Sequence, residues 1–328
     1  MKKMKNKRYI KLLLFPIGLA LVVFTVQTFI NNWEDIRNLR IVSPALLLLS
    51  LPLLAVNLYA TGKLFDTVLR PHGLKIKGAE SFGLANLARF GNYISFGQVG
   101  FAIRMFYLKK QHTVRLRDSL SGLGISNLAF YFMAVVLILA SLMLLDIAME
   151  IKKPIAYTAI LFGVLVLSFM TIIYFANSNK SNSYINKLPN FFMNFMRSVK
   201  HIVKSKNTVL LSLAWSTLLL FTFVGLTWIE FAALGLNITL VETTFLASAS
   251  SLAALINITP AGIGVNEGLL LLAGGALQIP PDLILGSAII RRVIVFSFVA
   301  MVSLIFSKQI FQLSLPALLR SIKNQNIR

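Results

Sequence analysis

Two segments that combine helix-breaking residues with polar ones lie far apart in this chain and share a pattern. When Gly100 is aligned with Gly264, the segment 94–101 overlays the segment 258–265. Each follows an apolar stretch of 16 residues, which as a helix would reach only about 24 Å and would not cross a bilayer comfortably. Non-helical backbone at membrane depth must be buried in protein or line a cavity, and paired broken segments of this kind indicate a transporter's binding site.

The later segment has the residue types of a phosphate-binding turn, which are Pro260, Gly262, Gly264, Asn266 and Glu267. The proline pushes the residue before it out of the helical region, and the glycines allow unusual backbone and close approach. The amides that follow would then begin a helix inside the membrane, and a helix N-terminus binds anions readily. An ordinary proline–glycine turn between two spans is the alternative interpretation.

The early segment offers Gly97 and Gly100, with Arg89 in the apolar arm before them and Arg104 just after them. We expect both arginines to contact a substrate phosphate on its approach from the cytoplasm. For Arg104, a role as a positive anchor beside the neighbouring lysines is an equally open interpretation.

Charged groups inside apolar stretches need partners, because an acid or a base at the bilayer centre costs about 2.5–3.5 kcal/mol on insertion scales. Arg291 and Arg292 lie about 13 Å into the last apolar stretch and diverge by about 100° on a helix. We expect one of them, with Arg292 as the candidate, to pair with Glu267, and the other to be free for a lipid phosphate. Alternatively Glu267 carries a coupling proton or cation, and the arginines reach the outer head groups. Glu230 is expected near the outer interface.

The composition excludes several classes of protein. Hydrophobic residues make up 57% of the 328 residues and charged residues 13%, with a mean hydropathy of +0.77, which does not fit a soluble globule. The absence of cysteine excludes disulfides, thiol catalysis and cysteine-ligated metals, and the three histidines, dispersed over basic loops, do not suggest a metal site. The net charge of +21 does not indicate nucleic-acid binding, because the basic residues lie between apolar stretches and meet anionic head groups there. We expect no cofactor.

The chain is expected to form one all-α membrane domain, 1–328, with about six full spans and two opposed re-entrant hairpins at about 79–108 and 243–278. The full spans are predicted at 9–30, 42–59, 120–145, 155–176, 209–234 and 283–307. Of the 32 Lys and Arg residues, 25 lie in five segments that would face one side of the membrane, and four lie in the loops of the other side. This asymmetry predicts a protein of the cytoplasmic membrane with both termini in the cytoplasm. The two hairpins would then enter from opposite sides, as an inverted repeat.

In these motifs and in the layout of its apolar stretches, the chain resembles the lysylphosphatidylglycerol synthase transmembrane family, also called flippase-like domain proteins. The family's late motif is similar to Pro-Gly-Gly-(Ile/Leu)-Gly-Val-x-Glu, with Ala261 here in place of the first glycine. The matching residues are Pro260, Gly262, Ile263, Gly264, Val265 and Glu267.

The family's early motif resembles Pro-Gly-x-x-Gly-Glu-x-x-Arg and is matched less completely. Phe96 replaces the proline and Phe101 replaces the acid, and the residues that match are Gly97, Gly100 and Arg104. A later arginine of the family is matched by Arg291 or Arg292. The missing acid implies a divergent substrate.

The resemblance implies translocation of a lipid. We expect an anionic phospholipid or a polyprenyl-phosphate-linked envelope intermediate to be flipped across the membrane. The family's synthases carry an aminoacyltransferase domain after the membrane half, which we expect this chain to lack, so lipid aminoacylation is not expected. Two alternatives stay open: a polyprenyl-phosphate-dependent glycosyltransferase, with Glu34 and Asp35 as its acidic pair, and a non-catalytic scaffold among envelope-biosynthesis enzymes.

Overall fold

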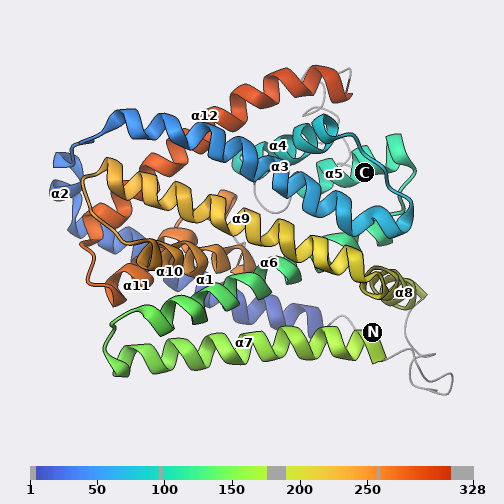
Figure 1. Ribbon diagram of the computed structural model, residues 1–328, viewed down its shortest axis with the longest axis horizontal. Helices are drawn as coiled ribbons and strands as arrows, with labels where there is room; N and C mark the ends of the chain where they lie inside the picture. The colour runs from blue at the N-terminus through green and yellow to red at the C-terminus, as the bar shows by residue number, and fades with distance from the viewer. Residues whose placement is uncertain (1–4, 96–98, 176–189, 257–258, 312–328) are drawn as a thin grey trace.

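All the regular structure in the described part of the chain is helical. A computed structural model describes residues 5–95, 99–175, 190–256 and 259–311 (Figure 1). Short 3₁₀ helices flank α3 at 44–49 and 70–72, and two more, 252–256 and 260–262, follow α10. The α-helices are α1 (Lys5–Asn31), α2 (Trp33–Asn38), α3 (Ser50–Leu69), α4 (Gly78–Ile94), α5 (Val99–His112), α6 (Leu116–Leu144), α7 (Met149–Phe175), α8 (Asn190–Lys204), α9 (Lys206–Ala233), α10 (Leu240–Ser251), α11 (Val265–Ala276) and α12 (Pro281–Phe311).

Long apolar helices dominate the fold, as the sequence predicts. Within the described residues, four helical segments are long and apolar enough to cross a membrane, at Pro44–His72, Leu116–Leu144, Lys206–Ala233 and Pro281–Phe306. Two shorter apolar helices occupy Leu19–Asn31 and Leu240–Ile256. The prediction of an all-α membrane protein is therefore confirmed.

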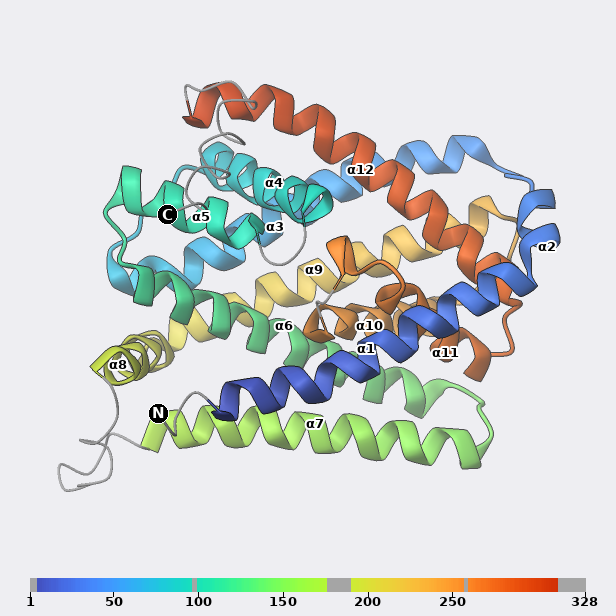
Figure 2. The ribbon, with the colours of Figure 1, turned by 180° about the vertical axis from the view of Figure 1, so that it is seen from behind.

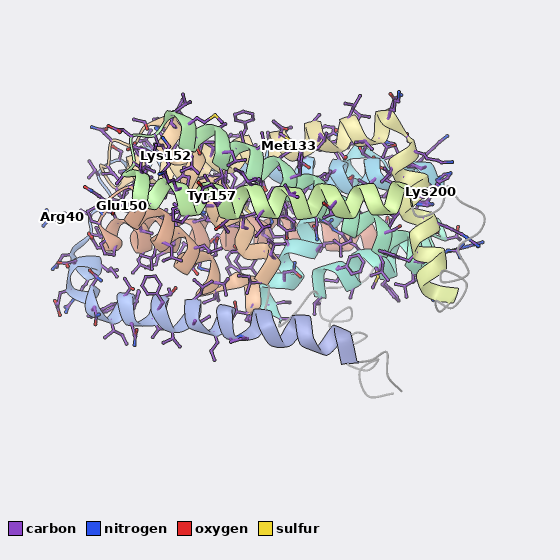
Figure 3. The ribbon with its side chains drawn as sticks, turned by 90° about the horizontal axis from the view of Figure 1, so that it is seen from below. Arg40, Met133, Glu150, Lys152, Tyr157 and Lys200 are labelled. Atoms are coloured by element: carbon purple, nitrogen blue, oxygen red, sulfur yellow. The ribbon has the colours of Figure 1, made fainter. Side chains whose placement is uncertain are left out.

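Charged side chains gather at the two ends of the molecule. Figure 3 shows Arg40, Glu150 and Lys152 at one end and Lys200, on α8, at the other, with Met133 and Tyr157 between them. The end that holds α8 also contains the α3–α4 and α5–α6 connections, and we call it the basic end (Figure 1). Between the ends many exposed side chains are large and apolar, as expected of a lipid-facing surface.

Two pairs of shorter helices enter this bundle from opposite ends. The chain runs along α4 from the basic end towards the middle and returns along α5, whereas α10 starts at the far end and α11 returns to it (Figures 1 and 2). Residues 260–262, in the turn between α10 and α11, pack against α4. The turn of the second helix pair therefore packs against the first pair inside the protein.

Two glycines of the predicted motifs allow these turns to pack. A Cβ atom on Gly100 would lie 1.9 Å from the carbonyl oxygen of Ala88, so that only glycine lets α5 approach α4 this closely. Gly264 has a φ of +82°, and a Cβ there would lie 2.9 Å from Cγ2 of Val22 in α1. Their role in the structure is thus one of backbone geometry and helix contact.

Candidate substrate cavity

A cavity of about 420 Å³ lies where the two helix pairs meet. Its walls come from α3, α4, α5, α6, α9, α10, α11 and α12 and from the 260–262 turn. Five of the residues predicted to bind substrate line it: Arg89, Arg104, Gly262, Asn266 and Arg291. Segments more than 150 residues apart in the chain therefore line one cavity, as the repeated pattern predicts.

Other predicted residues lie behind this wall. The residues found to line the cavity do not include Gly100 of α5, Pro260 and Gly264 of the turn before α11, Glu267 of α11 or Arg292 of α12. Gly97 falls outside the described residues.

Arg89 reaches the cavity from α4 and is held by one neutral side chain. Its Nη2 atom donates a hydrogen bond to Oδ1 of Asn57, at 2.9 Å. Asn57 is buried on α3, and its Nδ2 atom donates to Oγ1 of Thr222 at 2.8 Å. The amide dipole of Asn57 is thus oriented by α9 and presents its oxygen to the guanidinium.

Arg104 lies in the same cavity with fewer partners. Its guanidinium lies 5.2 Å from the ring centroid of Phe65, a cation–π contact, and its buried Nε atom has no hydrogen-bond partner within the described structure. Arg89 is close enough to repel it electrostatically. None of the residues found to line the cavity is an aspartate or a glutamate. Two positive charges therefore stand in the cavity without a carboxylate.

Glu267 pairs with Arg292, as predicted. The Nε atom of Arg292 donates to Oε1 of Glu267 at 2.7 Å, and the other carboxylate oxygen accepts the amide of Gly264, also at 2.7 Å. Glu267 thus caps the N-terminus of its own helix. The anion site expected at this helix start is therefore already occupied in part by a side chain of the protein.

The prediction that the second arginine is free was wrong. Arg291 donates from Nε to both carboxylate oxygens of Glu230 at 2.9 Å, and from Nη2 to Oγ1 of Thr227 at 2.9 Å. Glu230 is only 2% exposed, so its side chain is turned into the protein and does not reach the surface near the end of α9, where the sequence suggested it would lie. Only Nη1 of Arg291 lacks a partner in the part of the chain described. Because the two arginines diverge around α12, one ties this helix to α9 and the other ties it to α11.

Comparison with known proteins shows to which family the chain belongs. The family model of the lysylphosphatidylglycerol synthase TM region matches residues 9–303. The chain belongs to this family. As a member of the lysylphosphatidylglycerol synthase TM family, it is a multi-pass membrane protein, and the resemblance inferred from its motifs is confirmed. It is also similar to the UPF0104 membrane protein MJ1078 of Methanocaldococcus jannaschii, with 29% identity over 186 residues, which cover 54% of this chain and 76% of the relative.

Sequence reasoning missed three residues that organise the site. Asn57 orients Arg89, and Thr227 and Glu230 hold Arg291. The sequence did contain a signal, because Asn57 and Glu230 are polar residues inside long apolar stretches. Polar residues in membrane spans usually bind a ligand or pair with another polar group, and this holds for a member of the lysylphosphatidylglycerol synthase TM family. Which residue each one contacts depends on helix rotation, which the sequence alone does not give.

Proposed function

We propose that this protein translocates an anionic lipid between the leaflets of the cytoplasmic membrane, either a phospholipid or a polyprenyl-phosphate-linked envelope intermediate. The observation that supports it is the charge of the cavity, where the described residues offer Arg89 an amide dipole and Arg104 an aromatic ring but neither of them a carboxylate. Arginine at membrane depth is costly, and a phosphate group that enters the cavity offsets that cost through bidentate, charge-assisted hydrogen bonds.

In this proposal the long axis of the molecule runs through the membrane from one side to the other. The spans are α1, α3, α6, α7, α9 and α12, and the α4–α5 and α10–α11 pairs are re-entrant hairpins that open to opposite sides. The concentration of Lys and Arg at the basic end supports an orientation in which that end and both termini face the cytoplasm. A head group would reach Arg104 and Arg89 from the cytoplasm and leave past Asn266, while its acyl chains stay in lipid.

The two ion pairs on α12 have a different part in this mechanism. Arg291 and Arg292 carry their own carboxylates, so that their charges are balanced before substrate arrives. They fix α12 against α9 and against the α10–α11 hairpin. We therefore assign substrate binding to the arginines of the α4–α5 hairpin and a positioning role to the pairs.

Reconstitution tests the proposal. The purified protein is incorporated into vesicles with a fluorescent anionic phospholipid or a fluorescent polyprenyl phosphate, and flipping is followed by chemical quenching of the outer leaflet. Arg89→Gln should slow flipping at least tenfold, whereas Arg37→Gln, which removes an exposed positive charge on α2, should not. Asn57→Asp should also be slow, because it gives Arg89 the carboxylate that the substrate would otherwise supply. Equal rates for protein and empty vesicles with every lipid would overturn the proposal.

A further inference from the structure

A second pocket lies at the basic end, away from the substrate cavity. Its volume is about 680 Å³, and it is lined by residues of the α3–α4 and α5–α6 connections and of α8. All three histidines of the chain converge there, although their loops are far apart in the sequence. Four permanent cations join them, namely Lys75, Arg115, Arg117 and Arg197.

The positive charge of this pocket is largely uncompensated. Asp118 is the one carboxylate found in its wall, and it already accepts a hydrogen bond from Oγ of Ser198 at 2.9 Å and has Nε of Arg117 at 3.6 Å. Lys75, Arg115 and Arg197 have no carboxylate within salt-bridge distance among the described residues. Three cations therefore face a concave surface without a carboxylate partner of their own in the described part of the chain.

Polar contacts hold the floor of the pocket in place. Oγ of Ser198 on α8 lies 2.6 Å from Oγ of Ser121 on α6. The same oxygen lies 2.9 Å from Nε2 of His72, in the short helix that follows α3. On the other wall, His112 contacts Oε1 of Glu80 at 2.6 Å. These contacts join α6, α8 and the 70–72 helix in one set and α4 and α5 in another, so the loops that carry Lys75 and Arg115 are anchored beside the pocket.

The pocket is separate from the substrate cavity. The two share no lining residue. An apolar cluster lies between them, with Leu74 and Val114 on the side of the pocket and Phe65 and Leu123 on the side of the cavity. A charged group in the pocket would have to cross buried side chains to reach Arg104, so the pocket is a site of its own.

We propose that this basic pocket is a binding site for a phosphate-bearing anion that arrives from the cytoplasmic side, independent of the site in the substrate cavity. Guanidinium groups bind phosphate oxygens in pairs, and the lysine and imidazole groups add further donors. The number of cations and the volume fit a group with more than one negative charge, such as a diphosphate, better than a single carboxylate. The source is either a soluble phosphate compound or the head group of a phosphate-bearing lipid.

Binding of inorganic pyrophosphate to the full-length purified protein tests the site. Titration calorimetry in detergent, at fixed salt, compares the wild type with Arg115→Gln/Arg197→Gln, both exposed rim residues whose loss should leave the fold intact. The matched control, Lys109→Gln/Lys110→Gln, removes the same charge from exposed positions at the same end outside the pocket. We expect the rim variant to bind at least tenfold more weakly and the control to bind as the wild type does.

Competition identifies the source of the anion. Displacement of pyrophosphate by short-chain phosphatidic acid, but not by short-chain phosphatidylcholine, assigns the pocket to a lipid head group, and its absence assigns it to a soluble phosphate compound. The proposal is overturned if neither pyrophosphate nor phosphatidic acid binds, or if the control variant loses as much affinity as the rim variant. Loss of pyrophosphate binding in Arg89→Gln would also overturn it, because the anion would then sit in the substrate cavity.

Discussion

Four arginines inside this protein have two kinds of environment. Arg291 and Arg292 each have a carboxylate partner. Among the described residues, Arg89 instead has the amide of Asn57, and Arg104 has the ring of Phe65. A protein that needed only to bury these charges would pair all four, because an unpaired buried charge is the most costly arrangement. The unpaired arginines are therefore the ones that a ligand is expected to satisfy.

The two ion pairs should differ in what they contribute to stability. In the Glu230–Arg291 pair the side chains are 3% and 8% exposed, so that Glu230→Gln leaves a buried guanidinium without its counter-charge and should cost about 3–5 kcal/mol. The side chain of Arg292 is 24% exposed, and Glu267→Gln should therefore cost clearly less, since this guanidinium is less fully enclosed by protein and its long side chain can turn out of the bundle. Thermal unfolding of both variants in detergent measures the difference. Equal losses in the two variants would contradict this account.

At the scale of elements, close backbone contact decides how the α4–α5 hairpin folds. Gly100→Ala places a methyl group against the carbonyl of Ala88, so the two helices must separate, and we expect a loss of several degrees in the unfolding temperature. Gly124→Ala is the matched control, because Gly124 lies within α6 and a Cβ there meets no atom within 4 Å. That control should be neutral or slightly stabilising, since alanine favours helix by about 1 kcal/mol over glycine. Equal unfolding temperatures for both variants would show that the hairpin tolerates a wider spacing.

The sequence predicted much of this architecture, because lengths and breaks are local properties. Apolar runs of about 20 residues mark the long helices, and glycines, with Pro260 in the later segment, mark the two breaks in the pattern. The partner of Arg291 could not be predicted in this way. Glu230 lies 61 residues before it, and only the rotation of α9 about its axis turns this acid towards α12 rather than towards the lipid. The partner of Glu267 could be predicted, because Arg291 and Arg292 stand together in the last apolar stretch of the sequence.

On the scale of the whole molecule, the distribution of charge and the course of the helix pairs make one prediction about sidedness. The chain contains no cysteine, so single cysteines introduced at chosen positions report alone. α4 has 17 residues and is about 26 Å long, and α5 returns from the middle of the bundle, so that Lys75 and Lys110 should lie on the same side of the membrane. Asn237 and Asp282, which flank the α10–α11 pair, should lie on the other.

The sidedness of these cysteines is measured with a membrane-impermeant maleimide applied to intact and to permeabilised cells. Cysteines at positions 75 and 110 should react only after permeabilisation, because the basic end faces the cytoplasm, and cysteines at 237 and 282 should react in intact cells. A cysteine at exposed Arg37, at the far end, serves as a control for outside labelling. If positions 75 and 110 were labelled from opposite sides, α4 and α5 would cross the membrane together, and the cavity arginines would no longer lie at its middle. The charge argument for an anionic lipid would then fail, because arginines near an interface are satisfied by water and need no substrate.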